Sequence, residues 1–298
     1  MGKAFGRHGR YFYKYNSTKA KTTIIHHFLL PLPGLFTPMQ PMALVTLTTD
    51  FGWRDHYQAL LKGAMLCKND RLHIIDISHD IANYDIVQAA FLFRNAWRSF
   101  PKGTIHVLSV NDFSGGHMAF IALRHEGQYF IGPDNGIFSL VFDELPSDIY
   151  QLDFDDHGQF PLKDIYANAV GHIANEYPFS EIGQPVGEIV KRITFQPVTG
   201  HSHIRGSVIH IDKYENIVVN INHFLFERVG QDRDFTLYFK RHEPIITLSR
   251  HYHDVSVGEV LCLFNASGYL EIAINMGKAA SMLGLNIEDT VQIDFRSA

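Results

Sequence analysis

The fold is decided by residues 44–52, which read LVTLTTDFG. The first six residues are aliphatic or β-branched, which is typical of a buried strand, and a turn-forming Asp and Gly end the run. Residues 72–77 and 104–110 have the same character, and a helical pattern precedes each of them. Strands that alternate with helices are typical of an α/β layer with a largely parallel sheet. We therefore expect such a layer over residues 43–195.

The helices of this layer are predicted from apolar periodicity and capping residues. Residues 56–68 are predicted to be helical, with Asp55 as the N-cap. A second helix is predicted over residues 85–99, begun by Asp85 and ended by a following proline. It is apolar nearly all round, which indicates that it is buried.

The pattern changes after about residue 183, where glycine and proline become frequent. Residues 197–206 are predicted to form a linker or long loop. Short strands are predicted beyond it at residues 207–212, 217–221, 235–239, 259–264, 269–274 and 290–295. Closely spaced strands with few helices are typical of a small all-β domain. We expect a barrel-like β domain over residues 196–298.

Charge is unevenly distributed along the 298 residues. Residues 1–42 carry six Lys or Arg and no acid, whereas the remainder holds 20 basic and 31 acidic residues. An acidic body argues against nucleic-acid binding, which requires a basic face. We expect the basic segment to be a disordered extension, with a targeting peptide as the alternative.

Apolar runs and cysteines limit the class of protein further. No apolar run approaches the ~20 residues that span a bilayer, so we expect no membrane segment. The two cysteines, Cys67 and Cys262, are far apart and form neither a disulfide framework nor a zinc motif. We therefore expect a cytoplasmic protein. Two histidine pairs, at residues 201–203 and 251–253, lack a third ligand at a motif spacing, and we expect no metal.

Two segments carry side chains that could bind a ligand. Asp50 follows a buried strand, and the carboxyl ends of such strands are where open α/β sheets bind ligands. A carboxylate there can accept both hydroxyls of a ribose, although capping the next turn is the alternative. Residues 211–216, which read IDKYEN, offer a carboxylate, an aromatic ring and an amide that could bind an amine and a flat base. A hairpin turn explains the same residues.

These segments stand in the order found in one known family. Its motifs correspond here to TTDFG at 48–52, DISH at 76–79, FPKGTIHV at 100–107, GPDNG at 132–136, IDKYEN at 211–216 and YLEIAINMG at 269–277. Over residues 44–295 the chain resembles the S-adenosyl-L-methionine (SAM) hydroxide adenosyltransferase family, hydrolase relatives of the fluorinase and chlorinase. The resemblance implies a homotrimer or a dimer of trimers. It also implies that SAM or adenosine lies between one subunit's N-terminal domain and its neighbour's C-terminal domain, with no other cofactor.

The resemblance also assigns roles to individual residues. Asp50 is implied to hold the ribose hydroxyls, with Tyr84 beside the sugar. Asp55 and Asp212 are implied to meet the methionine ammonium group. The remaining ligand-binding candidates are Ser114 and the residues implied to surround the adenine, which are Tyr214, Asn216, Asn275 and Met276.

The catalytic positions depart from the family pattern. Its hydrolases activate a water with an Asp, an Arg and a His, and in the ungapped match these become Asn111, Met118 and Pro161. Asn cannot take a proton and Met cannot stabilise an anion, so the usual route is lost. Asp112 and His117 lie close by and could rebuild an Asp-His pair, with Asn111 as a third candidate. The alternative is that Asp112 only shapes a turn.

Three functions follow from this pattern. The first is an enzyme that converts SAM and water into adenosine and L-methionine. The second is a protein that binds SAM or adenosine without turnover. The third is an adenosyltransferase that uses another nucleophile. We expect SAM hydrolysis to be weak or absent, because all three water-handling residues of the family are replaced.

Overall fold

The computed structural model describes residues 42–113, 119–153, 160–240 and 242–296. Apart from Met42, the extension predicted at the N-terminus lies outside these residues. None of the helices within the described ranges is long and apolar enough to cross a membrane.

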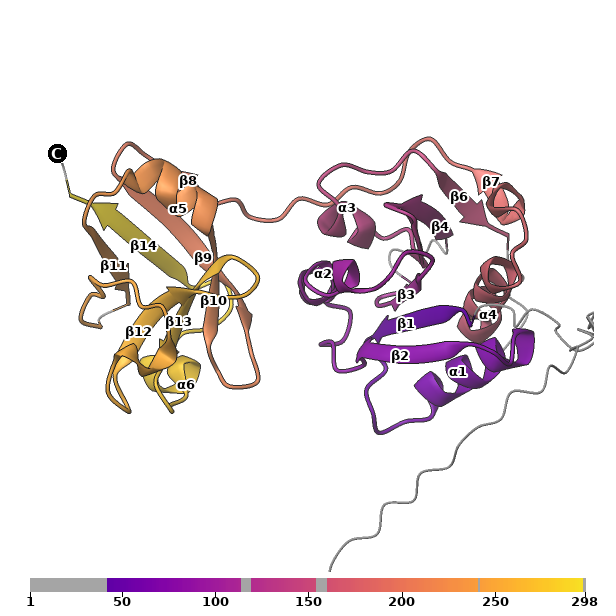
Figure 1. Cartoon of the computed structure of the whole chain (residues 1–298), viewed down its shortest axis with the longest axis horizontal. Coiled ribbons are helices and arrows are strands. Elements are labelled where there is room, and N and C mark those ends of the chain that lie inside the picture. Colours follow the sequence, from indigo (N-terminus) through magenta and orange to yellow (C-terminus); the bar gives the residue numbers. More distant parts are fainter. Residues whose placement is uncertain (1–41, 114–118, 154–159, 241, 297–298) are drawn as a thin grey trace, which may run out of the picture. The chain divides into compact units, whose positions relative to one another are not determined.

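The first sheet has seven strands in the order β2-β1-β3-β5-β4-β6-β7 (Figure 1). Their bounds are β1 Leu44–Thr49, β2 His73–Ser78, β3 Ile105–Ser109, β4 Phe120–His125, β5 Gln128–Pro133, β6 Ile149–Leu152 and β7 Gly183–Pro185. β1 pairs in parallel with β2 and β3, and β3 pairs in parallel with β5. β4, β6 and β7 are added antiparallel. The predicted α/β layer is therefore confirmed, and β1, β2, β3 and β5 form its parallel part.

Helices cover both faces of this sheet (Figure 1). They are α1 Tyr57–Lys68, α2 Ile86–Arg94, α3 Ile137–Val141 and α4 Pro161–Ala174, with short 3₁₀ turns η1 Trp97–Ser99 and η3 Phe179–Glu181. α1 and α4 share one core cluster with alternate residues of the strands, and α2 and α3 share the other. The alternation follows from the strand period of two.

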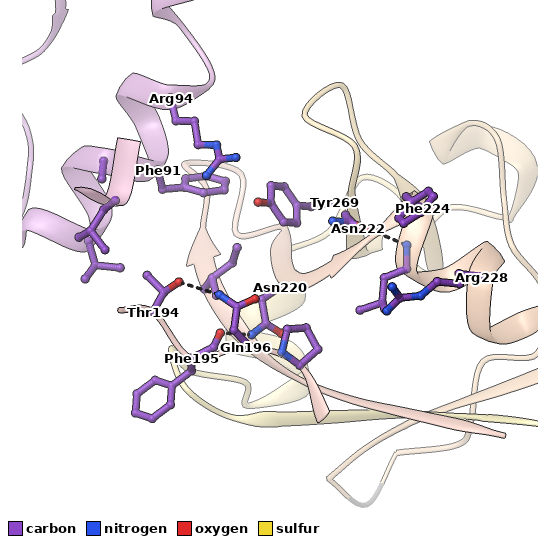
Figure 2. Close-up of a pocket in the computed structure, with 16 residues that line it drawn as sticks. Phe91, Arg94, Thr194, Phe195, Gln196, Asn220, Asn222, Phe224, Arg228 and Tyr269 are labelled. Carbon is purple, nitrogen blue, oxygen red and sulfur yellow. Dashed lines mark hydrogen bonds between the residues drawn. The ribbon is translucent and has the colours of Figure 1, made fainter. Parts of the chain in front are cut away.

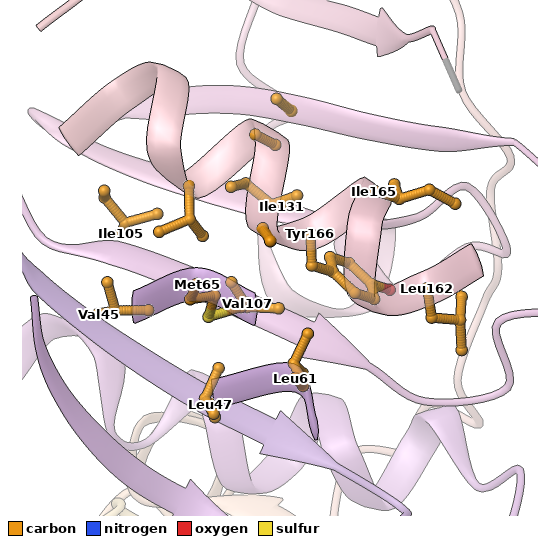
Figure 3. Packing of buried hydrophobic residues seen from close by; sticks show 14 of the residues in the cluster. Val45, Leu47, Leu61, Met65, Ile105, Val107, Ile131, Leu162, Ile165 and Tyr166 are labelled. Carbon is orange, nitrogen blue, oxygen red and sulfur yellow. The ribbon is translucent and has the colours of Figure 1, made fainter. Parts of the chain in front are cut away.

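The core between the sheet and α4 includes a tyrosine (Figure 3). Tyr166 of α4 is fully buried among Val107, Leu162 and Ile131, and its ring packs edge-on against Phe120. A buried tyrosine hydroxyl requires a hydrogen-bond partner. That partner is described with the site below.

The helix boundaries confirm one predicted cap and correct another. Asp85 Oδ1 accepts from the backbone N–H groups of Val87 and Gln88 at 3.0 and 2.9 Å, as predicted for an N-cap. The predicted cap Asp55 is wrong, because His56 is the residue that precedes α1 and no side chain caps it. The chain therefore leaves Asp55 exposed in the turn before the helix.

The second sheet is antiparallel and curls into a half-barrel, which confirms the predicted β architecture. Its strands are β8 Val198–Thr199, β9 His203–Ile211, β10 Ile217–Asn222, β11 Phe235–Phe239, β12 Val260–Phe264, β13 Tyr269–Ile274 and β14 Thr290–Phe295. The order is β11-β14-β9-β10-β13-β12, with β8 paired to β9. The helices are α5 His223–Gly230, α6 Ala279–Leu283 and the 3₁₀ turn η4 Tyr252–Asp254.

The loop predicted at residues 197–206 is wrong in both halves, because β8 occupies Val198–Thr199 and pairs with β9. β9 already begins at His203, and buried Ile204 pairs with Ile293 of β14. Gly206 suggests a loop in the sequence, but in the sheet a Cβ there would lie 2.6 Å from Asn220 Oδ1. The glycine is required by close packing rather than by a turn.

Candidate functional site

Asp50 lies where β1 ends, and its carboxylate is held by backbone donors. Oδ2 accepts from the N–H of Tyr84 at 3.0 Å and from the N–H of Asn111 at 3.3 Å. The Asp50 N–H donates to Ser109 O at 3.4 Å, across the pair of parallel strands β1 and β3. Among the described residues Oδ1 accepts no hydrogen bond. One oxygen is therefore fixed and the other is available to a ligand.

The two donors depend on an unusual backbone conformation. Tyr84 has φ of 67° and Asn111 has φ of 54°, both in the left-handed region. Such angles are uncommon for residues other than glycine and cluster at ligand sites. They turn the two N–H groups from the loops after β2 and β3 toward the loop after β1.

Asn135, from the GPDNG segment, secures the loop after β3. Its Nδ2 donates to Val110 O at 2.9 Å and to Asn111 O at 3.0 Å, and its Oδ1 accepts from Ile137 N at 3.1 Å. The side chain is buried. The segment therefore forms a turn, as its composition predicts, and also stabilises the left-handed residue that donates to Asp50.

Asp112 is buried next to this loop, with an exposed fraction of 6%. Ser109 Oγ donates to its Oδ2 at 2.8 Å, and Tyr166 Oη donates to its Oδ1. Burial raises the pKa of the Asp112 carboxyl to about 7, opposed by these two hydrogen bonds and reinforced by the charge of Asp50. Tyr166 Oη also lies 3.2 Å from Leu108 O. The carboxyl is thus enclosed by the core, and its charge is costly.

The surface around Asp50 is aromatic. Trp53, Tyr84 and Phe113 come from the loops after β1, β2 and β3, and each is more than half exposed. Asp55 lies in the first of these loops and is also exposed. Exposed aromatic residues around a half-buried carboxylate indicate an interaction site.

The second group of predicted site residues lies in the half-barrel. Asp212 Oδ1 accepts from the N–H groups of Tyr214 and Asn216, both at 2.8 Å, and Asn216 Nδ2 donates to Asp212 Oδ2 at 3.1 Å. These bonds form a tight turn between β9 and β10, which agrees with the hairpin interpretation. The turn presents the Tyr214 ring to solvent. It therefore has a structural role whether or not a ligand binds there.

Glu215, which the sequence does not single out, connects this turn to the segment after β13. Its carboxylate accepts from Lys278 Nζ at 2.9 Å and from Ser281 N at 3.0 Å, and its backbone O accepts from Ala280 N. Met276, with φ of 57°, is exposed in the same segment, two residues before Lys278. The structure thus brings the Tyr214 turn and the Met276 turn together. Asn275 is fixed separately, since its Nδ2 donates to Val255 O at 2.8 Å.

The two groups are not joined within one chain. Among the described residues, no hydrogen bond, ion pair or ring contact links the group Asp50, Asp55 and Tyr84 to the group Asp212, Tyr214, Asn216, Asn275 and Met276.

The catalytic candidates are only partly described. Asn111 contributes its backbone N–H to Asp50, and Pro161 is the first residue of α4. Ser114, His117 and Met118 lie outside the described residues. Within the described part of the chain, no group of three His, Cys, Asp or Glu is arranged to hold a metal ion.

A separate pocket of about 340 Å³ contains none of these site residues (Figure 2). It includes the segment Thr194–Gln196, where Gln196 Nε2 donates to Thr194 Oγ1 at 3.3 Å. Asn220 Nδ2 donates to Phe195 O at 2.9 Å, which ties this segment to β10. The segment Thr194–Gln196 thus forms part of the pocket wall.

Comparison with known proteins gives the family. A model of the SAM hydroxide adenosyltransferase N-terminal domain matches residues 45–183, and one of the C-terminal domain matches residues 206–292. An (R)-S-adenosyl-L-methionine hydrolase of Methanocaldococcus jannaschii is 27% identical over 283 residues, covering 87% of this chain and 99% of the relative. A fluorinase of an Actinoplanes species is 23% identical, covering 86% of this chain and 99% of the relative.

A solved structure agrees with this result. The crystal structure of an uncharacterized conserved protein from Thermotoga maritima superposes with a TM-score of 0.75 at 26% identity, covering 84% of this chain and 99% of that one. The N-terminal domain model matches the segment that forms the first sheet, and the C-terminal domain model matches the segment that forms the second sheet. The chain belongs to the SAM hydroxide adenosyltransferase family.

Proposed function

We propose that this protein binds SAM, and the adenosine formed from it, through the ribose. The observation that carries the proposal is the Asp50 carboxylate, with Oδ2 fixed by two backbone N–H groups and Oδ1 open. A fixed carboxylate can accept the 2′ and 3′ hydroxyls together, and charge-assisted bonds of this kind are strong. The relatives from Methanocaldococcus jannaschii and Thermus thermophilus are SAM hydrolases, which supports SAM as the ligand.

The reaction that we propose is hydrolysis at the ribose 5′ carbon. A water oxygen attacks C5′ in line with the C5′–S bond, which breaks with its electron pair moving to sulfur. The products are adenosine and L-methionine, and the water gives up one proton. Because the positively charged sulfur is a good leaving group, positioning of the two reactants supplies much of the rate.

A second candidate, binding without turnover, is favoured by the residues around Asp50. Asn111 and Pro161 stand where the family resemblance places a carboxylate and an imidazole. Asp112 has a pKa of about 7, in the range suited to a general base. Its burial and its bonds to Ser109 and Tyr166 instead favour a role in holding the loop. We propose that turnover is weak for this reason.

Turnover is tested by incubating the protein with SAM and measuring adenosine and methionine, beside the Methanocaldococcus relative. We expect a rate lower by roughly 10²–10⁴-fold, the usual contribution of general acid–base catalysis. If Asp112 and His117 have replaced the lost residues, the rate is instead close to that of the relative and disappears in both Asp112→Asn and His117→Ala. That result would refute the proposal of weak turnover.

We propose further that the protein acts in the cytoplasm as a homotrimer, in which the Asp50 group of one subunit faces the Asp212 group of its neighbour. The exposed aromatic residues around Asp50 and the exposed Tyr214 and Met276 support such an interface. Light scattering should give the mass of three chains, or six. A single chain that binds SAM would contradict the proposal.

Mixed trimers provide a sharper test of the shared site. Asp50→Ala and Asp212→Ala subunits should each bind SAM poorly when pure. Refolding a mixture of the two should restore binding, because some neighbouring subunits then pair an intact Asp50 with an intact Asp212. No recovery in trimers shown to be mixed would place both residues in the same subunit's site.

A further inference from the structure

Four polar side chains form a connected series beside the turn that carries Asp50, which we call the His79 network. Thr49 Oγ1 lies 2.8 Å from His79 Nδ1, and His79 Nε2 lies 2.9 Å from Asp76 Oδ1. Lys62 Nζ donates to Asp76 Oδ2 at 2.7 Å. Thr49 and His79 are fully buried, whereas the other two are partly exposed. The network therefore leads from the surface to the residue that precedes Asp50.

His79 also holds the residues that follow Asp50. Its backbone O accepts from Gly52 N at 2.8 Å, and Phe51 N donates to Thr49 Oγ1 at 3.3 Å. The Trp53 ring stands edge-on to the imidazole, with centroids 4.7 Å apart. The turn is thus attached to His79 on both sides of Asp50.

The contacts of His79 determine which ring nitrogen carries the hydrogen. A hydrogen on Nδ1 would leave the Nε2 lone pair facing the Asp76 carboxylate, which is repulsive. A hydrogen on Nε2 lies close to that carboxylate, as a charge contact without hydrogen-bond geometry, and leaves Nδ1 to accept from the Thr49 hydroxyl. Burial lowers the pKa of His79, so the ring is neutral, and Lys62 Nζ pairs with the other oxygen of Asp76 at 2.7 Å. The hydroxyl of Thr49 then has a fixed direction.

We propose that His79 is a positioning residue for Asp50, which acts through Thr49 and is itself oriented by Asp76 and Lys62. This inference rests on the proposed binding of adenosine, since its effect appears in recognition of the ribose hydroxyls. The carboxylate must lie within a few tenths of an ångström of two hydroxyls at once. Residues that only orient a binding group have large effects on such geometry.

The test compares two ligands and two conservative variants. Adenosine and 2′,3′-dideoxyadenosine differ only in the hydroxyls that Asp50 accepts, so the ratio of their dissociation constants measures diol recognition. In His79→Asn the amide oxygen takes the place of Nδ1 and keeps the bond from Thr49. In His79→Gln the longer amide reaches the place of Nε2 and keeps only the contact with Asp76.

We expect His79→Asn to retain the preference for adenosine within about threefold, and His79→Gln to lose roughly 10- to 100-fold of it, the usual effect of a supporting residue. In the Asp50→Ala background, His79→Gln should change the ratio no further, because coupled residues are not additive. An equal loss in both variants, or an unchanged ratio in His79→Gln, would overturn the proposal. So would additive effects in the double variant.

His106 is the matched control. It is equally buried, and its Nδ1 lies 2.6 Å from Thr46 Oγ1 of the same strand β1, but its Nε2 contacts Gln128 and not the turn. His106→Asn and His106→Gln should lower the melting temperature without changing the ligand ratio. A changed ratio in the His106 variants would show that the ratio responds to loss of stability in general and not to the His79 network.

A measurement without ligand separates this inference from the proposed function. The ¹⁵N spectrum of the histidine rings should show His79 with a hydrogen on Nε2 and none on Nδ1. A hydrogen on Nδ1 refutes the network whatever the protein binds. Failure of the unaltered protein to bind adenosine, with the expected tautomer present, refutes the proposed function and with it the role in ribose recognition.

Discussion

Asp50→Ala is expected to weaken SAM binding strongly while the protein stays folded. The variant removes a half-buried carboxylate whose Oδ2 is fixed by the N–H groups of Tyr84 and Asn111. A charge-assisted pair of hydrogen bonds to the ribose hydroxyls is worth roughly 2–4 kcal/mol. That corresponds to about a 30- to 1,000-fold higher dissociation constant, measured by calorimetry.

The control for this prediction is Asp70→Ala, which removes the same charge from an exposed residue before the amino end of β2. Its affinity for SAM should equal that of the unaltered protein. Asp50→Asn gives a graded result, since an amide oxygen accepts more weakly than a carboxylate. Unchanged affinity in Asp50→Ala would remove Asp50 from the site and with it the basis of the proposed function.

Asp112→Asn is expected to stabilise the protein at alkaline pH and to weaken its pH dependence. The pKa of Asp112 is about 7 in the folded chain against 3.8 for an ordinary aspartate. The folded state therefore keeps a proton that the unfolded chain loses. The associated stability is complete below about pH 4 and is lost as the pH rises through about 7.

The size of this effect follows from the two pKa values. Their difference corresponds to roughly 4 kcal/mol, of which about 2–3 kcal/mol is lost between about pH 5 and pH 8. The uncharged amide of Asp112→Asn avoids that loss and can still bond to Ser109 and Tyr166. Denaturant unfolding at the two pH values measures the free energy of unfolding of both proteins. The difference between the variant and the unaltered protein should increase by this amount from about pH 5 to about pH 8.

Comparing the two proteins at each pH isolates Asp112 from other groups. Burial lowers the pKa values of His79, His106 and His210. Their contributions to the free energy of unfolding therefore rise with pH, whereas that of Asp112 falls. They are the same in both proteins and cancel in the difference. A difference between the two proteins that does not change with pH would show that Asp112 is already charged at acidic pH.

The sequence predicts those parts of the fold that depend on local rules. Asp85 begins α2 because its own side chain caps the next two N–H groups, and residues 269–274 and 290–295 form strands at the predicted bounds. Gly206 is misread because its reason is the packing of Asn220, a residue of the neighbouring strand. Turns and caps are local, whereas close packing between strands is not.

The same division applies to the candidate site. Asp50 is predictable, because it follows a buried strand in an α/β pattern and lies where such sheets bind ligands. The partners of Asp112 are not, since Tyr166 is 54 residues away and reads as an ordinary core position of a helix. Glu215 is missed for a similar reason, because its partners Lys278 and Ser281 belong to a distant segment. Their roles arise only when the chain has folded.

The two hydrogen-bond donors to Asp50 are backbone N–H groups, which affects the substitutions that this site can accept. Tyr84 and Asn111 hold the carboxylate through the peptide backbone, so their side chains can be exchanged without releasing it. Asn and Asp are among the residues that best tolerate the left-handed conformation at position 111. A single substitution, Asn111→Asp, can therefore add a proton acceptor next to Asp50 while the backbone path stays the same. The side chains beside Asp50 can therefore change while the backbone hydrogen bonds that hold its carboxylate stay the same.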